Sequence, residues 1–146
     1  MKLKLFDNFY YEFVKQNCLK EFVNLNYRKV FFDCHNPFEE DIHSKFNLLI
    51  YYENEIIGWS FGKAINSNTF YMLNTGILPQ YQSKGIYSSL LPKILKKLNS
   101  LGFQFVLSKH IINSKIAIFK QKQGFEIIQN MTDKKFGKVS VLKYSF

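Results

Sequence analysis

The sequence is poor in cysteine and in long apolar runs, and each shortage excludes a class of protein. Cys18 and Cys34 are too few for a disulfide framework, and they show no ligand spacing with the three histidines that would indicate a metal site. No stretch approaches the ~18 to 20 apolar residues that a membrane span needs, and the basic N-terminus lacks the apolar segment of a signal peptide. We therefore expect a cytoplasmic protein with reduced cysteines, no metal and no membrane partner.

Acidic residues are also scarce: 11 Asp and Glu stand against 20 Lys and Arg, which gives a net charge of +9. Such an excess attracts anions, for example nucleic acid or a polyphosphate cofactor, although a lysine-rich composition without function explains it equally well. The basic residues are spread along the chain and do not form a short run interleaved with aromatic residues. We therefore expect no nucleic-acid partner.

Repeats, low-complexity tracts and Gly/Ser linkers are absent as well, and the 146 residues predict a single domain. Apolar residues near helical spacing indicate one or two helices within residues 10–30. Beyond a loop around Asn36-Pro37, β-rich apolar runs separated by turns predict strands at residues 46–52, 56–65 and 69–78. The remaining elements are expected to be a helix at 84–100, a strand at 103–108, a helix at 113–123, and strands at 125–130 and 139–144.

This order of elements predicts a fold of the α+β or α/β class with a mixed sheet. A strand–helix–strand unit implies a parallel strand pair with a right-handed crossover, whereas the three earlier strands are joined by tight turns and are antiparallel. Pro92 lies inside the 84–100 helix, where it removes one amide donor and crowds the carbonyl of Ser88. We expect a kink in the helix at that point.

The strongest functional signal is the turn Gln82-Ser83-Lys84-Gly85, between the strand that ends at Pro79 and the following helix. The first backbone N–H groups of a helix have no intrahelical partner and lie at the positive end of its dipole. A pyrophosphate can accept hydrogen bonds from them, and Gly85 lets the backbone approach it closely. Side-chain donors would come from Gln82, Lys84 and Ser88. The alternative is an ordinary strand-to-helix turn with one glycine.

This turn resembles the signature of the GNAT family of N-acetyltransferases. That signature is Gln or Arg, two residues, Gly, one residue, then Gly or Ala, after a strand with a Val-x-Pro-like end. Here Ile77-Leu78-Pro79 is followed by Gln82-x-x-Gly85-x-Tyr87. The chain departs from the pattern in that Tyr87 replaces a small residue and Ser83 stands where Gly is frequent.

A second motif resembles the same family. In GNAT proteins the next helix starts after an Asn, carries an aliphatic face and ends in Gly-Phe. Here Asn113 is followed by Ile116, Ala117 and Phe119, and Gly124-Phe125 closes the segment. Two such motifs, in this order and separated by a strand, are much more specific than either alone.

The resemblance covers roughly residues 46–144 and implies acetyl-CoA as the cofactor and direct acetyl transfer to an amine. It implies a cofactor-binding core at 46–146, a helical segment at 1–45 on the acceptor side, and a mostly antiparallel twisted sheet whose central parallel strands splay apart. The pantetheine would pair with backbone near Ile77, Leu78 and Pro79. Further contacts to the cofactor are implied for Gln82, Ser83, Lys84, Gly85, Ile86, Tyr87, Ser88, Asn113 and Phe119. The resemblance also implies that a homodimer can form through a sheet edge.

Three residues are candidates for proton transfer. Many relatives have a Tyr seven residues after the Asn, placed to protonate the leaving thiolate; here that position is Lys120, which is otherwise an ordinary solvated lysine like Lys115 and Lys122. His110 follows the 103–108 strand and would accept the amine proton, or it is a simple loop histidine. Tyr87 would reach the sulfur if its side chain points into the cleft, and otherwise it packs. No Ser-His-Asp arrangement is recognisable.

The acceptor pocket has no signature in the sequence. Trp59 would line it or be buried in a sheet face, and Tyr71 would form its wall or belong to the core. Asn74 lies on the same strand as Tyr71. The acceptor is therefore expected to be an amine of a small molecule or of a protein. The rival interpretation is a catalytically weak module of the same fold that binds or senses CoA.

Overall fold

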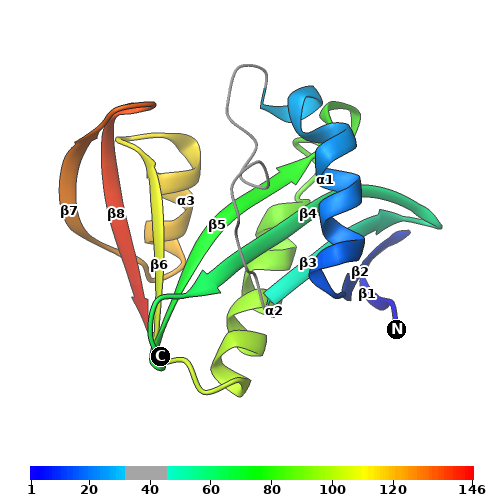
Figure 1. The fold of residues 1–146 in the computed structure, drawn as a ribbon, viewed down its shortest axis with the longest axis horizontal. Helices are drawn as coiled ribbons and strands as arrows, with labels where there is room; N and C mark the ends of the chain where they lie inside the picture. The colour runs from blue at the N-terminus through cyan, green and yellow to red at the C-terminus, as the bar shows by residue number, and fades with distance from the viewer. Residues whose placement is uncertain (32–45) are drawn as a thin grey trace. The chain divides into compact units, whose positions relative to one another are not determined.

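A computed structural model describes residues 1–31 and 46–146 and contains the mixed sheet that the sequence predicts (Figure 1). The strands pair in the order β1-β2-β3-β4-β5-β6-β8-β7. β5 and β6 are parallel, whereas β1–β2, β2–β3, β3–β4, β6–β8 and β7–β8 are antiparallel. The expected fold class is thereby confirmed. The strands are β1 (Leu3–Phe6), β2 (Phe9–Phe13), β3 (Phe46–Tyr52), β4 (Glu55–Ala64), β5 (Thr69–Ile77), β6 (Phe105–Ile111), β7 (Glu126–Asp133) and β8 (Gly137–Ser145), and the helices are α1 (Gln16–Val30), η2 (Pro79–Tyr81), α2 (Ile86–Ser100) and α3 (Lys115–Lys122).

The chain forms two compact units, each built from discontinuous segments. The first comprises Met1–Lys63 and Leu73–Lys97, and the second comprises Ala64–Met72 and Leu98–Phe146. β5 and α2 therefore contribute residues to both units. The loop expected around Asn36-Pro37 lies outside the described residues.

The first unit begins with a β-hairpin, which corrects the expectation of a wholly helical N-terminal segment. β1 and β2 pair antiparallel across a turn in which Asp7 has a φ of 44°, and β2 then pairs with β3. The sequence of β2 is Phe-Tyr-Tyr-Glu-Phe, and aromatic residues favour strands. Phe13 happens to lie at helical spacing from the residues that follow it, so the periodicity placed it in the helix. The predicted helix itself is present as α1.

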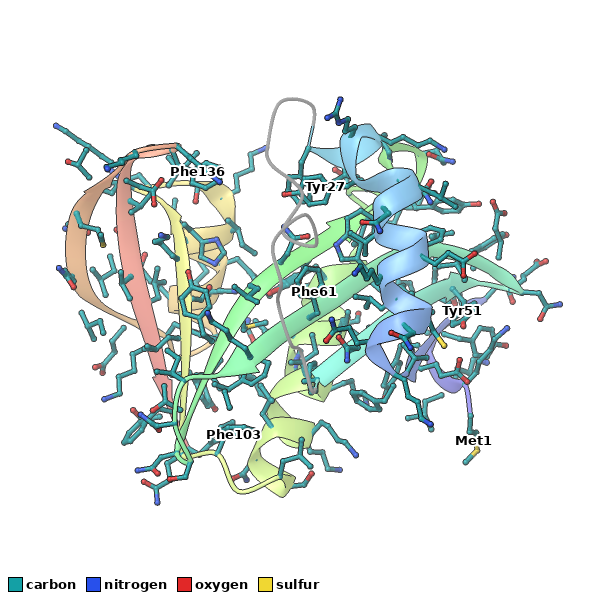
Figure 2. All side chains as sticks on the ribbon, in the orientation of Figure 1. Met1, Tyr27, Tyr51, Phe61, Phe103 and Phe136 are labelled. Carbon is teal, nitrogen blue, oxygen red and sulfur yellow. The ribbon has the colours of Figure 1, made fainter. Side chains whose placement is uncertain are left out.

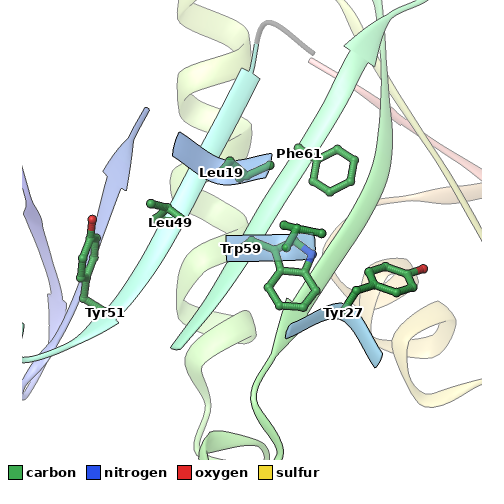
Figure 3. Close-up of a cluster of buried hydrophobic side chains, with 7 residues drawn as sticks. Leu19, Tyr27, Leu49, Tyr51, Trp59 and Phe61 are labelled. Carbon is green, nitrogen blue, oxygen red and sulfur yellow. The ribbon is translucent and has the colours of Figure 1, made fainter. Parts of the chain in front are cut away.

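α1 packs its apolar face against β3 and β4 in the first unit. Figure 3 shows Leu19 and Tyr27 of α1 beside Leu49, Trp59 and Phe61 of the two strands, and all five side chains are buried. The rings of Tyr27 and Trp59 stack with their centroids 6.3 Å apart. Because α1 covers one face of these strands and α2 the other (Figure 1), the first six residues of β3 are all buried. This explains why β3 is apolar at every position except Asn47 instead of alternating between apolar and polar residues.

α2 has the buried stripe that its periodicity predicts. Ile86, Leu90, Leu91 and Ile94 are at most 2% exposed. The helix continues past Pro92, and the kink expected there remains a prediction. The buried stripe fixes the start of α2, and with it the direction of its first N–H groups.

The second unit joins the start of β5 to β6, β8 and β7. The parallel register matches Thr69, Phe70 and Tyr71 with Phe105, Val106 and Leu107. Figure 2 labels Phe103 at the end of this unit where β6 begins and Phe136 in the turn between β7 and β8 at its other end. Phe103 packs against Phe70 with ring centroids 5.4 Å apart. α3 lies against β6 and β8.

Candidate functional site

The turn at residues 82–85 in the first unit presents unused backbone donors. Ser83 and Gly85 adopt left-handed backbone, with φ values of 61° and 79°. Within the described ranges, nothing accepts a hydrogen bond from the backbone N–H of Ser83, Lys84, Gly85 or Ile86. The four turn residues are exposed, and the first turn of α2 carries no acidic residue. Consecutive N–H groups at a helix N-terminus form an anion-binding concavity.

Hydrogen bonds within the segment fix the shape of this turn. The Gln82 side-chain Nε2 donates to the Ile77 carbonyl over 2.8 Å, and the Gln82 backbone N–H donates to the Pro79 carbonyl over 3.2 Å. The Leu78 N–H donates to the carbonyl of Ile57 in β4 over 2.8 Å. The side chain of Gln82, expected to contact the cofactor, thus uses one of its donors to close the turn. The neighbouring Leu78 is buried, whereas Ile77 and Pro79 are partly or fully exposed.

Ser88 and Tyr87 occupy the first turn of α2. The Ser88 hydroxyl donates to the Gly85 carbonyl over 3.0 Å, so in this structure it supports the turn. Tyr87 is partly exposed, and burial of its hydroxyl raises the pKa of that group far above its ordinary value. A phenol of this kind stays protonated at neutral pH, so it is a hydrogen-bond donor and not a base.

A hollow of about 480 Å³ lies beside the turn, still within the first unit. Its lining consists of Phe9, Tyr52, Gln80, Tyr81 and Lys84. The ring centroids of Tyr52 and Tyr81 are 5.6 Å apart, and those of Phe9 and Tyr52 are 5.2 Å apart. Lys84 therefore adds a positive charge both to the exposed amides and to an aromatic surface.

In the second unit, α3 buries a lysine against β6. Lys120 is 2% exposed, and its Nζ donates to Ser108 Oγ over 2.6 Å and to Met72 Sδ over 3.7 Å. Its Nζ also lies 5.4 Å from the centroid of the Phe125 ring. Burial lowers the pKa of Lys120 to about 7, because a charged amine is poorly solvated in the interior. The interpretation of Lys120 as a solvated lysine is therefore wrong, whereas Lys115 and Lys122 are exposed.

His110 lies inside β6 and not in the loop after it, which corrects the predicted end of this strand. Its Nε2 shares a hydrogen bond with Ser108 Oγ, two residues earlier on the same face of the strand. Burial, followed by the charge of Lys120, lowers the pKa of His110 to about 3. Two of the three proton-transfer candidates, Lys120 and His110, are thus brought together through Ser108.

Ser108 was not among the residues that the sequence singled out. The strand predicted from the sequence ends at this residue, which puts His110 in a loop. Had the strand been extended to Ile111, the spacing of two would have put Ser108 and His110 on one face. The neighbouring Lys109 points to the other face, where its Nζ forms an ion pair with Asp133 Oδ2 at 2.9 Å.

The motif from Asn113 to Phe125 has a local explanation. Asn113 is exposed and has a φ of 59°, a backbone conformation that Asn adopts more readily than most residues. α3 then begins at Lys115, with Ser114 as its N-cap: Ser114 Oγ accepts from the Ala117 N–H over 3.3 Å. Asn113 thus precedes the cap, which shortens the predicted helix by two residues at its start.

The Gly-Phe end of the motif places an aromatic ring beside the buried lysine. The Gly124 N–H donates to the Gln121 carbonyl and the Phe125 N–H donates to the Lys120 carbonyl, the two hydrogen bonds of a Schellman motif. Gly124 has a φ of 106°. Phe125 is consequently turned into the core at 2% exposure. Phe119 is partly buried on the same helix.

The three acceptor-side candidates differ in their access to solvent. Trp59 is 0% exposed, and its Nε1 donates to Asn74 Oδ1 over 2.7 Å. Asn74 retains some exposed surface. Tyr71, in the second unit, is partly exposed, and burial is the main cause that raises the pKa of its hydroxyl. The ring of Trp59 therefore belongs to the core of the first unit, whereas Asn74 and Tyr71 keep surface for a ligand.

Other kinds of site find little support in the described part of the chain. No group of three or more His, Cys, Asp or Glu residues within 1–31 and 46–146 is arranged to hold a metal ion. None of the helices in the same ranges has the length and apolar character required to cross a membrane.

Comparisons with known proteins agree with the fold. A family model described as the acetyltransferase (GNAT) family matches residues 15–125. The ribosomal-protein-S18-alanine N-acetyltransferase of Escherichia coli superimposes with a TM-score of 0.74 at 12% identity, over 94% of this chain and 93% of that one. No curated protein matches the sequence significantly.

Two solved structures with bound ligands also share the fold. Naa50 of Arabidopsis thaliana, in complex with the bisubstrate analogue CoA-Ac-MVNAL, has a TM-score of 0.74 at 22% identity and covers 96% of this chain and 100% of its own. A GNAT family acetyltransferase of Elizabethkingia anophelis with acetyl-CoA bound has a TM-score of 0.65 at 16% identity, over 97% of this chain and 100% of its own. Since the family model spans most of the sequence, the chain belongs to the GNAT acetyltransferase family.

Proposed function

We propose that this protein is an acetyl-CoA-dependent N-acetyltransferase that transfers the acetyl group directly to an amine of a small molecule or a protein. The observation that carries the proposal is the run of four backbone N–H groups, from Ser83 to Ile86, that have no acceptor within the described ranges and lie at the N-terminus of α2. Such groups suit a pyrophosphate because they are consecutive, unused and at the positive end of a helix.

The residues of the first unit fit this cofactor. The amides of residues 83–86 would hold the pyrophosphate, Lys84 would add charge, and the backbone at 77–79 would lie along the pantetheine. Ser83 adopts left-handed backbone as Gly85 does, so the serine takes up the conformation that a glycine would favour at this position. Asn113 and Phe119 are proposed as further contacts. When bound, acetyl-CoA supplies the thioester that an amine attacks.

Lys120 is the residue that we propose for proton transfer. An acid–base group acts best when its pKa lies near the working pH, and burial lowers the pKa of Lys120 to about 7. It therefore exists in both protonation states at neutral pH. Tyr87 is proposed only as a hydrogen-bond donor, because its raised pKa keeps it protonated. Asn74 and Tyr71 are proposed to face the acceptor.

A second candidate function is a CoA-binding module with weak or no turnover. It is favoured by the same residue: Lys120 is 2% exposed, and a group this buried in the described structure has little access to a substrate. The two functions agree on cofactor binding and differ in acetyl transfer.

Binding is tested by thermal unfolding with acetyl-CoA and by calorimetric titration. A ligand at 100 times its Kd stabilises the folded state by ~2.7 kcal/mol, which corresponds to a Tm increase of about 5–10 °C for a chain of this size. Lys84→Gln should weaken binding about three- to tenfold, since it removes one charged donor. The matched control is Lys93→Gln, an exposed lysine two turns into the same helix, which should leave the Kd unchanged. An unchanged Tm with millimolar acetyl-CoA contradicts the proposal.

Turnover is tested by measuring thiol release from acetyl-CoA with a panel of small amines and peptide N-termini. Acetyl transfer to any of them supports the enzyme. Tight binding of acetyl-CoA without transfer to any amine supports the binding module instead.

A further inference from the structure

Lys120, Ser108 and His110 form one hydrogen-bonded chain in the second unit, which we name the buried triad. Lys120 Nζ donates to Ser108 Oγ over 2.6 Å, and Ser108 Oγ shares a hydrogen bond with His110 Nε2. Ser108 is 1% exposed and Lys120 is 2% exposed, whereas His110 retains some contact with solvent. The chain thus runs from a buried amine to a partly exposed ring.

Two elements of the second unit, β6 and α3, supply the members of the triad. Ser108 and His110 lie on one face of β6. The neighbouring strand β8 pairs Leu142 with Ser108 and Ser140 with His110. Lys120 comes from the inner face of α3, three residues after the buried Ala117. A methionine could fill the space of Lys120 without the cost of burying an amine. If Lys120 served only to fill space, a methionine would do so at a lower free-energy cost. The hydrogen-bonded chain is therefore not explained by packing.

The serine hydroxyl is the member that links the other two. A lysine ammonium can only donate hydrogen bonds, whereas a hydroxyl both donates and accepts. With Lys120 charged, Ser108 accepts from Nζ and donates to a neutral His110. With Lys120 neutral, the directions reverse: His110 Nε2–H donates to Ser108, and the hydroxyl donates to the amine.

We propose that Ser108 completes a proton relay that connects the amine of Lys120 to solvent through His110. One proton passes from Lys120 Nζ to Ser108 Oγ while the hydroxyl proton of Ser108 passes to His110 Nε2, and the other ring nitrogen of His110 releases its proton to water. The relay forms and breaks only N–H and O–H bonds, and its net result is the loss of one proton from Lys120. The reverse sequence restores that proton.

This inference rests on the proposed acetyl transfer and adds a positioning residue to it. The transfer requires an amine nitrogen to lose one proton and a thiolate sulfur to gain one. If Lys120 provides that proton, the buried amine must recover it before the next turnover. His110 has a pKa too low to store a proton at neutral pH, but a relay needs it only to exchange one for another.

The surroundings of the triad are supplied by α3, β5, β6 and β8. Within the triad, Lys120 of α3 and His110 of β6 are the titratable groups. The residues that face it from the neighbouring strands, Met72 of β5 and Leu142 and Ser140 of β8, are uncharged. The side chain of Ser140 donates to Asn130 Oδ1 over 2.6 Å. The ion pair of Lys109 with Asp133, beside Tyr71, lies on the opposite face of β6.

The first experiment measures the chemical shifts of the two ring nitrogens of His110 by NMR from pH 3 to 8, without any substrate. Protein labelled at histidine nitrogen gives three ring systems, and His110→Gln identifies the signals of His110. In the wild type the ring should stay neutral down to about pH 4, given a pKa of about 3. Lys120→Met should raise the pKa of His110 by roughly one unit, since it removes the nearest positive charge, and Ser108→Ala should change the ratio of the two ring tautomers.

The second experiment measures kcat against pH for Ser108→Ala and for the matched control Ser140→Ala. Ser140 is another buried serine, 1% exposed, on the strand next to β6. Ser108→Ala should lower kcat by about tenfold or more and shift the pH profile, with the Kd for acetyl-CoA unchanged, whereas Ser140→Ala should keep the wild-type profile. A group that itself transfers the proton typically contributes about 10²- to 10⁴-fold, so a loss of about tenfold is the smallest effect expected of a residue that only connects two such groups.

The outcomes separate this inference from the proposed function. Unchanged pKa and tautomers of His110 in both variants overturn the relay, even in an active enzyme. A shifted His110 in a protein that acetylates nothing supports the hydrogen-bonded chain but removes the acetyltransferase proposal. If Ser108→Ala does not fold, the NMR comparison of the wild type with Lys120→Met decides alone.

Discussion

Ser83 shows how a departure from the family pattern can be tolerated at a single residue. The position favours glycine because its backbone is left-handed, with a φ of 61°. A residue with a side chain in this conformation costs ~1–2 kcal/mol. Ser83 is exposed, so the cost comes mainly from the backbone conformation and not from burial of the side chain. The serine keeps the N–H of the cradle in place with some backbone strain.

Ser83→Gly should therefore stabilise the protein by up to about 1 kcal/mol, because the relief of strain exceeds the ~0.5–1 kcal/mol of extra chain entropy that glycine brings to the unfolded state. The measurement is the urea midpoint. Ser89→Gly makes the same change in the first turns of α2, where the backbone is helical, and should destabilise by ~0.5–1 kcal/mol. Equal losses in the two variants would show that the Ser83 side chain is stabilising.

The sequence located these residues better than it described their surroundings. Counting seven positions from Asn113 identified Lys120, but lysine is almost always solvated, and the sequence of α3 has no strong apolar stripe to show which face is buried. The sequence does not single out Ser108, because its role depends on the strand continuing to Ile111 and on contact with a lysine twelve residues later in the chain. Trp59 was left open between core and pocket, and only packing against α1 shows that its ring is buried.

At the scale of elements, the pair β4 and β5 depends on two glycines, of which Gly76 leaves room for that ring and Gly58 leaves room for the backbone of β5. A Cβ at Gly76 would lie 2.3 Å from Cζ2 of Trp59. At Gly58 a Cβ would lie 2.6 Å from the carbonyl oxygen of Gly76. The sequence predicted both strands but not this contact, because a glycine inside a strand indicates only that something approaches closely.

Gly76→Ala should destabilise the protein by about 3 kcal/mol, at the upper end of overpacking costs. Adding Trp59→Leu to it should recover part of the loss, since a smaller side chain gives the new methyl group space. Urea unfolding of both single variants and the double variant measures the coupling. The contrast is Gly102→Ala, where a Cβ meets nothing within 4 Å and only the φ of 95° opposes it. A strictly additive double variant would contradict the predicted collision.

Element boundaries were the weakest predictions. Residues 46–52 were predicted with the bounds of β3, because turns on both sides define them. The N-terminal hairpin was missed, since its aromatic residues also fit a helical period. The strand predicted at 103–108 ends three residues before β6 does, because Lys109 and His110 interrupt the apolar run. That error hid the chain from His110 to Lys120.

For the whole molecule, the fold followed from two short motifs and the order of elements, while the acceptor did not. The motifs are local, since each depends on the backbone of a few residues such as Gly85 and Asn113. An acceptor pocket is assembled from side chains distant in sequence, and its chemistry has no local pattern. The net charge of +9 is also a property of the whole molecule. It favours anionic ligands and makes the free energy of unfolding depend on pH.

Lys120 should make its own contribution to the pH dependence of the free energy of unfolding, between pH 7 and 10.5. Its pKa is about 7 when folded, below its ordinary value of 10.5, so in this window the unfolded chain binds a proton that the folded protein has released. Stability from this group must then rise with pH, by at most ~1.4 kcal/mol per unit, and below about pH 7 the full cost of the buried charge remains.

Lys120→Met removes the cost, so the variant should exceed the wild type in stability at pH 6 and lose this advantage towards pH 10. Lys122→Met, at an exposed position of the same helix, subtracts the general effect of net charge. Urea unfolding at pH 6, 8 and 10 measures the difference, and a gap that stays constant across the three would mean that the Lys120 amine is charged, and therefore solvated or paired, throughout.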